Sequence, residues 1–191
     1  AWVVLHRLAS NEFLSFLLTR EGLTAPVVSA VGAVHTAGEG AIGQMKLSSD
    51  GRRLALVTAG NWGVELFDFD AATGHVSNAR SLNMDHTIEH PYGLEFSLSG
   101  ERLYVSSTRG GGLWQLSEGA PPVQLAPGVS LGALQLAPDG RIYASVPDSG
   151  HLAAIAHADM QGMAANYQGR AVALNGQSGY GLPAALAEDY R

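Results

Sequence analysis

The chain has 191 residues, of which 46% are hydrophobic and 15% charged, a balance typical of one folded domain with little disorder. Its 17 acidic and 11 basic side chains give a net charge of −6, and the basic residues are scattered, which argues against nucleic acid as a partner. The absence of cysteine excludes disulfides and thiolate metal sites, and no apolar run approaches the ~20 residues that cross a bilayer, so we expect no membrane insertion.

The chain begins AWVVLHRL, without an initiator Met, a basic leader region or a cleavage site, and goes directly into a strand-like run. We therefore expect a piece of a longer polypeptide whose targeting signal lies upstream and whose remaining domains are among its partners. Three strand-like runs come first: Trp2–Arg7, Phe13–Thr19 and Val27–Val34.

An eleven-residue phrase then occurs three times, as KLSSDGRRLAL at 46–56, EFSLSGERLYV at 95–105 and QLAPDGRIYAS at 135–145. Its turn glycines, Gly51, Gly100 and Gly140, are 49 and 40 residues apart. Period-two alternation on both sides of a glycine turn predicts a β-hairpin. In the first copy two further strand-like runs follow, at 63–70 and 75–82, so each repeat is predicted to hold four strands.

Four strands in about 40 to 50 residues, repeated, are typical of a β-propeller blade. We therefore predict an all-β fold, a single domain over residues 1–191 built as a β-propeller of four-stranded antiparallel blades. Its blade pieces are predicted at about 1–36, 43–83, 92–127 and 131–176, with a final strand at 179–187.

That final stretch, GYGLPAAL, resembles YGLEFSL at 92–98 and is interpreted as the first strand of a blade without its followers. Three whole blades, three opening strands and one closing strand give about four blade equivalents. They form either an arc of a larger propeller, which we favour, or a closed four-bladed ring in which the last strand pairs with the opening strands.

The ordered phrases WVVLHRLASNEFLSFLLTREG, VELFDFDAATGHVSN, YGLEFSLSGERLYVS, LQLAPDGRIYAS and SGYGLPAAL span nearly the whole chain. Together they resemble the propeller region of gliding-motility-associated and type IX secreted surface proteins of Bacteroidetes. The resemblance implies a secreted or cell-surface propeller, and it supplies no catalytic residues. That family has further blades before the segment matching Trp2. FDFDAATGHV and the S-x-D-G turn also resemble lactonase-type propellers, although such motifs recur in propellers of unrelated function.

Candidate binding residues lie in loops that we expect to gather at one mouth of the central channel. The densest polar cluster is DHTIEH at 85–90, whose carboxylates and imidazoles could ligate a divalent cation or act as acid and base. Its spacing matches no zinc signature, and a solvated loop between blades is the simpler interpretation. We predict no catalytic residue, cofactor or metal ligand. The candidate ligand-binding residues are Asp85, His86, Glu89, His90, Trp62, Arg109 and His151.

Other motifs are interpreted as structural. The stretch DFDAATG at 68–74 has closely spaced oxygens but lacks the central glycine and late glutamate of a calcium loop, so we predict a turn in which Asp70 and Thr73 bond to backbone. His6 and His35 are predicted to be hydrogen-bonded structural histidines, and Trp114 to pack between blades.

Two functions are considered. The first is a non-enzymatic binding or scaffold module of a secreted or cell-surface protein, which contacts protein or glycan at the propeller surface. The second is a lactonase-like hydrolase with a divalent cation at the channel mouth that polarises a carbonyl and activates water. We favour the first because nothing in the sequence supports nucleophilic catalysis.

Overall fold

The computed structural model describes residues 1–183, which form four antiparallel sheets of four strands each. Two 3-10 helices, η1 (Gly38–Ala41) and η2 (Gly162–Ala165), lie in loops of this range. Neither is long and apolar enough to span a membrane. The fold of this range is therefore all-β, as predicted.

The sheets follow one another along the chain. The first contains β1 (Trp2–His6), β2 (Ser10–Thr19), the short β3 (Gly22–Leu23) and β4 (Val27–His35). The second contains β5 (Met45–Leu47), β6 (Arg53–Thr58), β7 (Gly63–Asp70) and β8 (His75–Ser81). The third contains β9 (Pro91–Phe96), β10 (Leu103–Ser107), β11 (Gly112–Ser117) and β12 (Ala120–Ala126). The fourth contains β13 (Leu134–Leu136), β14 (Ile142–Ser145), β15 (Ser149–Ile155) and β16 (Tyr167–Ser178).

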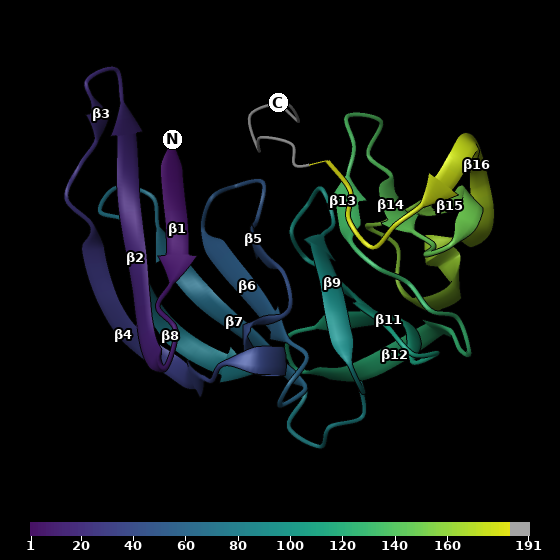
Figure 1. Cartoon of the computed structure of the whole chain (residues 1–191), viewed down its shortest axis with the longest axis horizontal. Helices are drawn as coiled ribbons and strands as arrows, with labels where there is room; N and C mark the ends of the chain where they lie inside the picture. The colour runs from purple at the N-terminus through teal and green to yellow at the C-terminus, as the bar shows by residue number, and fades with distance from the viewer. Residues whose placement is uncertain (184–191) are drawn as a thin grey trace.

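The four sheets are blades of a β-propeller and lie side by side along an arc, with the first and fourth sheets at its opposite ends (Figure 1). The repeated phrase forms the hairpin of the first two strands in the second, third and fourth sheets. Its glycines, Gly51, Gly100 and Gly140, have φ of 68°, 73° and 78°, a region that favours glycine, so the sequence repeat reflects one recurring turn.

Three hydrophobic clusters hold the arc together, one between each pair of neighbouring sheets. Strand β6 shows how a blade contributes to two of them: Leu54 and Leu56 enter one cluster, and Ala55 and Val57 enter the next. Because successive side chains of a strand point to opposite faces, both faces of such a strand are buried between blades.

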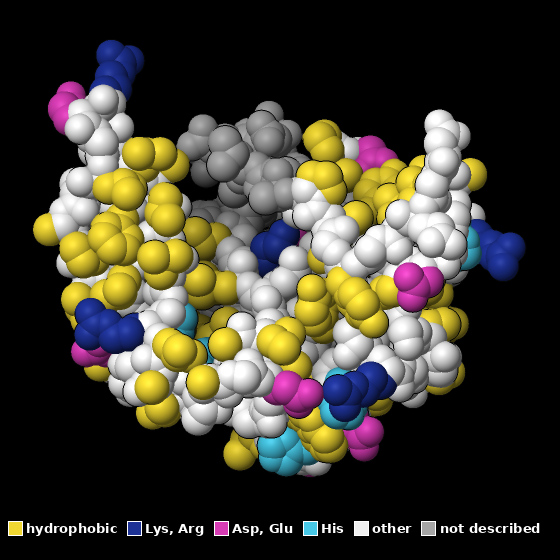
Figure 2. Space-filling view, viewed as in Figure 1, with side chains coloured by type: hydrophobic (Ala, Val, Ile, Leu, Met, Phe, Trp, Pro, Cys, Tyr) yellow, Lys and Arg dark blue, Asp and Glu magenta, His cyan; other side chains and the backbone are white. Residues whose placement is uncertain are grey.

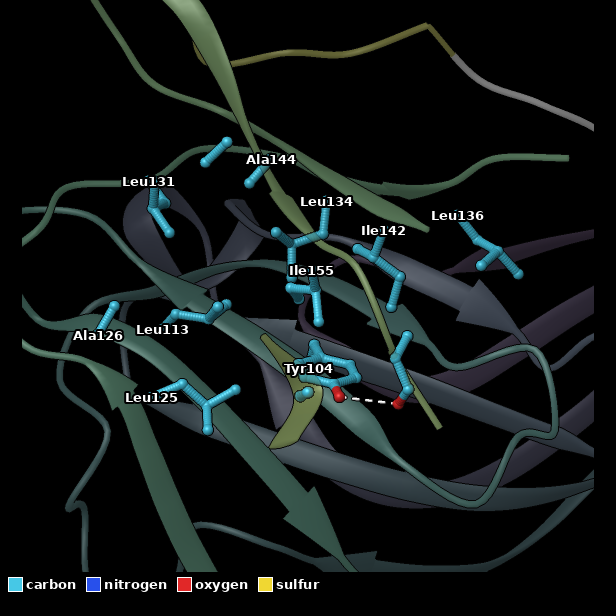
Figure 3. Close-up of a cluster of buried hydrophobic side chains, with 13 residues drawn as sticks. Tyr104, Leu113, Leu125, Ala126, Leu131, Leu134, Leu136, Ile142, Ala144 and Ile155 are labelled. Carbon is cyan, nitrogen blue, oxygen red and sulfur yellow. Dashed lines mark hydrogen bonds between the residues drawn. The ribbon is translucent and has the colours of Figure 1, made fainter. Parts of the chain in front are cut away.

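The third cluster, between the third and fourth sheets, surrounds Tyr104 (Figure 3). The Tyr104 side chain is 0% exposed, and its hydroxyl donates to the Ala158 carbonyl at 2.8 Å and accepts from Gln115 Nε2 at 2.7 Å. Burial raises the pKa of Tyr104 to about 12, so the phenol stays neutral.

The first sheet differs from the others in the blade positions that its strands occupy. Phe13 of β2 packs edge-on against Phe67 of β7, with ring centroids 4.9 Å apart, and the β8 amide of Val76 donates to Ser29 Oγ of β4. Strands β2 and β4 therefore take the third and fourth blade positions, and β1 takes the second. Among residues 1–183 nothing occupies the innermost position of this sheet. The two-residue β3 pairs with the end of β2, and the sequence analysis did not predict it.

The structure confirms the predicted turn at 68–74 and shows no strand in the described part of the predicted final strand. Asp70 accepts hydrogen bonds from the Ala72 amide and the Thr73 hydroxyl, and Gly74 has φ of 78°, so this stretch is the predicted turn. Residues 179–183 of the predicted final strand form no strand, and 184–187 lie outside the described residues.

Candidate binding site at the channel mouth

The loop between β8 and β9 is fixed by one buried asparagine. Asn83, 3% exposed, donates from Nδ2 to the carbonyls of Trp62 at 2.8 Å and Ile88 at 2.9 Å, and its Oδ1 accepts from the Ile88 amide at 3.0 Å. The Ile88 side chain is 0% exposed and inserts into the cluster between the second and third sheets. The loop is thus held in place by the hydrogen bonds of Asn83 and by the buried side chain of Ile88.

This anchored loop brings three predicted site residues together as the rim cluster, which we define as Trp62, His86 and His90. The indole lies edge-on to both imidazoles, with centroid separations of 6.1 Å to His86 and 5.3 Å to His90. All three residues have positive φ, of 52°, 55° and 47°. Non-glycine residues in this region cost conformational energy and are held only by their surroundings, so the cluster is preorganised by the loop.

The two carboxylates of the loop, Asp85 and Glu89, are both exposed. Asp85 Oδ1 accepts from the Thr87 amide at 3.4 Å, and its hydrogen bond with the Thr87 side chain is the main cause that lowers the Asp85 pKa. Glu89 is exposed, and its backbone carbonyl accepts from the Ser107 hydroxyl. Within residues 1–183 no group of three His, Asp or Glu side chains is arranged to hold a metal ion.

The remaining two predicted residues lie apart from the rim cluster. Arg109, in the β10–β11 turn, pairs with Glu39 of η1 at 3.2 Å, and both side chains are exposed. His151 Nδ1 lies 2.6 Å from the Ser149 hydroxyl within the fourth sheet. Of the predicted site residues, the structure thus brings Trp62, His86 and His90 together, whereas Arg109 and His151 have other partners.

A second concave site surrounds two histidines that the sequence analysis treated as structural. His6 and His35 stack with centroids 3.8 Å apart and line a pocket of about 330 Å³ between the first and second sheets. His35 Nε2 lies 3.5 Å from Glu65 Oε2, and Glu65 Oε1 accepts from the Ala33 amide. No spacing rule could have revealed this pair, because the two histidines meet only when β1 and β4 flank β2.

Only one ring nitrogen of His6 has a hydrogen-bond partner among the described residues, which corrects the expectation of a fully hydrogen-bonded structural histidine. It has a backbone hydrogen bond with Arg7, but its Nε2 is buried and has no partner among the described residues. Burial, followed by the nearby His35, lowers the pKa of His6. Both effects disfavour the protonated imidazole.

The channel itself contains a polar network from one repeated position. Lys46, Glu95 and Gln135 each stand five residues before the turn glycine of their copy of the phrase. Lys46 Nζ donates to Glu95 Oε2 at 2.9 Å and to Gln135 Oε1 at 2.8 Å, and the Leu136 amide donates to the same Glu95 oxygen. This network joins the innermost strands β5, β9 and β13, and it was missed because the three positions carry different residue types.

Comparison with known proteins shows the fold. No family model and no curated protein matches the chain. Among solved structures, the periplasmic gluconolactonase of Pseudomonas aeruginosa is similar with a TM-score of 0.55 and 18% identity, over 80% of this chain and 48% of that one. Hydrazine synthase of Kuenenia stuttgartiensis gives 0.53 and 14%, over 80% and 48%, and a Lactobacillus plantarum protein 0.51 and 18%, over 76% and 47%. The chain is thus similar to about half the length of each of these structures.

Proposed function

We propose that this chain is a non-enzymatic binding module of a β-propeller, and that it contacts a glycan or protein surface through the rim cluster. The observation that carries the proposal is the grouping of the Trp62 indole, from the β6–β7 turn, with the imidazoles of His86 and His90 on the β8–β9 loop. Asn83 ties the two segments together through the Trp62 and Ile88 backbone. Aromatic side chains held in place beforehand bind with little loss of conformational freedom, which is why they serve as anchors in recognition surfaces.

The chemistry of the same loop favours binding over hydrolysis. Its acidic side chains are exposed, and Asp85 accepts a hydrogen bond from the Thr87 amide of the same turn. General acid–base catalysis requires a carboxylate or imidazole within hydrogen-bonding reach of the reacting group and of its partner. The rim cluster presents ring faces and edges, which suit contact with sugar rings or side chains.

We also propose that the module belongs to an exported protein, secreted or displayed at the cell surface, of the kind found among gliding-motility-associated and type IX secreted proteins. Support comes from the ordered phrases of the sequence and from the fold it shares with a periplasmic protein. Expression of the intact parent gene followed by fractionation of medium, envelope and cytosol tests this, and a cytosolic protein would refute it.

The binding proposal is tested with a panel of immobilised neutral oligosaccharides and extracellular proteins, screened with labelled chain. We expect binding that Trp62→Ala and the double change His86→Ala, His90→Ala reduce by at least about tenfold, as for loss of a hot-spot contact. The matched control is His75→Ala, which removes an exposed histidine at the start of β8. Binding that all variants retain would refute the assignment to the rim cluster.

A lactone hydrolase is the second candidate, and it is favoured by the similarity in fold to a gluconolactonase. We would measure hydrolysis of gluconolactone with and without added Ca²⁺, Mg²⁺ or Zn²⁺, together with metal content. Turnover that His86→Ala or Glu89→Ala abolishes would replace the binding proposal with this one. If gluconolactone is not hydrolysed with any of these metal ions or without them, the hydrolase proposal is refuted.

A further inference from the structure

The second and third sheets border a groove that is open to solvent. It has a volume of about 430 Å³ and is lined by the end of β8, the loop that follows it, the end of β11 and the beginning of β12. Both sheets have all four strands within the described residues, and both lie in the interior of the arc (Figure 1). The groove therefore does not depend on the sheets at the two ends of the arc.

Most side chains that line the groove are apolar. Leu116 is 2% exposed, and the half-buried Leu82 packs against the same hydrophobic cluster between the two sheets. Met84, which is 81% exposed, borders the groove from the β8–β9 loop, and Pro121 and Pro122 border it from β12. Single exposed apolar residues are ordinary on a protein surface, but several that meet in one concavity mark an interaction site.

Asp85 gives the groove a negative charge. It is the only charged residue among those of 1–183 that line the groove, its side chain is exposed, and it forms no ion pair within this range. The charged groups nearby already have partners, since Glu118 pairs with Arg80 at 2.8 Å and Arg102 donates to Ser117 Oγ at 2.8 Å. An occupant with a cationic group would therefore be complementary to the groove.

The groove shares its loop with the rim cluster. Met84 and Asp85 stand between the anchor Asn83 and His86. Figure 2 shows histidine, acidic and hydrophobic side chains gathered along the lower edge of the molecule, where Figure 1 places the chain between β8 and β9. The hydrogen bonds of Asn83 therefore position Met84 and Asp85 before any partner binds.

The prolines limit how an occupant can bind. Pro121 and Pro122 have no amide hydrogen, so an added strand cannot pair with this end of β12. The register between β11 and β12 is also interrupted here, between Gln115 and Ser117. An occupant must therefore insert a side chain into the groove instead of extending the sheet.

The exposure of the lining residues favours a polypeptide over a small molecule. Small molecules bind in pockets that enclose most of their surface. Here Met84, Asp85, Ala120 and Pro121 are all exposed, so the groove covers an occupant from one side. A side chain carried by a polypeptide suits such a groove, because its backbone stays in water and neighbouring residues add contacts.

We infer that this groove binds a polypeptide segment in which an apolar side chain stands next to lysine or arginine. The apolar side chain packs against Met84, Pro121 and Leu116, and the cationic group pairs with Asp85. A flexible methionine adapts to side chains of different shape, and the net charge of −6 attracts a basic partner. The groove is a site of its own, and the inference does not require that the rim cluster bind anything.

The test uses three capped peptides that differ only in two central residues between glycines: leucine–arginine, leucine–glutamate and glycine–arginine. Each is titrated into the ¹⁵N-labelled full chain and followed by NMR. We expect the leucine–arginine peptide to bind most tightly and to shift the amide signals of Met84, Asp85, Gly119 and Ala120. No saturable binding of this peptide at millimolar concentration would overturn the inference, and so would equal affinity for the glycine–arginine peptide.

Charge reversal tests the role of Asp85. Asp85→Lys should invert the order, so that the leucine–glutamate peptide binds more tightly than the leucine–arginine peptide. Asp85→Asn, a smaller change at the same position, should remove the preference between the two. The matched control is Glu101→Lys, at an exposed carboxylate of the β9–β10 turn outside the groove, which should keep the order of the parent chain. An order that Asp85→Lys and Asp85→Asn leave unchanged contradicts the proposed contact.

A pair of methionines tests the apolar contact. Met84→Ser should weaken binding of the leucine–arginine peptide by at least about fivefold, as for loss of a significant interface contact. Met163→Ser, at a 75% exposed methionine of η2, should leave it unchanged. Equal effects of the two variants would refute the groove as the site. Binding that is lost in Trp62→Ala but retained in Met84→Ser would assign the peptide to the rim cluster instead, which also overturns the inference.

Discussion

The first sheet and the junction of the third and fourth sheets are built from the same kind of strands, yet they are buried very differently. At the junction, Tyr104, Leu113 and Ile155 are 0% exposed. In the first sheet, Leu5 and Val34 are more than half exposed, and the innermost strand position is empty among the described residues. Burial in this molecule is therefore decided by whether the face of a blade is covered by a neighbouring blade.

This difference follows from the way repeat folds obtain their stability. A single four-stranded blade cannot bury its own faces, so each interface contributes to both sheets that form it. Interior sheets have two such interfaces, and the first sheet has one, against β7 and β8. Substitutions should therefore cost more at a covered junction, such as the one around Tyr104, than on the outer face of β1.

The largest effect is expected at the junction. Tyr104→Ala removes a fully buried aromatic ring and the partner of Gln115, so we expect a loss of about 3–5 kcal/mol in the free energy of unfolding, measured in denaturant. Leu5→Ala, at an exposed position of β1, should cost within about 0.5 kcal/mol. Equal losses for the two variants would contradict the comparison.

The channel network should give the next largest effect. Lys46→Met leaves Glu95, whose side chain is 6% exposed, as a buried carboxylate without its cation, which typically costs about 3 kcal/mol. Adding Glu95→Gln should restore much of the loss because the unpaired charge is gone. Arg109→Met, at an exposed ion pair, should cost no more than about 1 kcal/mol. A double variant less stable than the single one would refute this account of the network.

The sequence predicted the fold through local signals and could not predict how distant segments meet. Alternation around Gly51, Gly100 and Gly140 is a local property, so the hairpins and the four-strand period were visible. The Lys46–Glu95 pair was not, because Lys46, Glu95 and Gln135 lie 49 and 40 residues apart in the sequence and meet only when their three strands converge on one channel. The shared position before each turn glycine was the one available signal.

A smaller loss is expected at the rim, where sequence reasoning found the loop but not its anchor. Asn83→Ala removes three hydrogen bonds and leaves the Trp62 and Ile88 backbone groups unpaired, so we expect a loss of about 2 kcal/mol and weaker binding through the rim cluster. Thr87→Ala, at an exposed position of the same loop, should cost within about 0.5 kcal/mol. Equal effects of the two changes would show that Asn83 is not the anchor.

That result would also explain why the candidate site was only partly predictable. The stretch from Asp85 to His90 is conspicuous because it contains two carboxylates and two imidazoles. Asn83 is one polar residue among many in the sequence, and its role depends on its burial and on the carbonyl of Trp62, 21 residues away. The residues that present a surface can be read from composition, whereas those that hold it in place need the folded structure.

The smallest effect is expected at His6, and it sharpens the contrast between the incomplete first sheet and the rest. The pKa of His6 is lowered in the folded chain, chiefly by burial, so between this pKa and the unfolded value of about 6.5 the unfolded state binds more protons. Stability contributed by neutral His6 is present above pH 6.5 and falls as the pH drops through this window. His6→Phe keeps a ring against Phe13 and cannot be protonated, so denaturant unfolding from pH 7.5 to 5 should show a weaker dependence on pH than in the parent chain. An unchanged dependence in His6→Phe would assign the pH dependence to other groups.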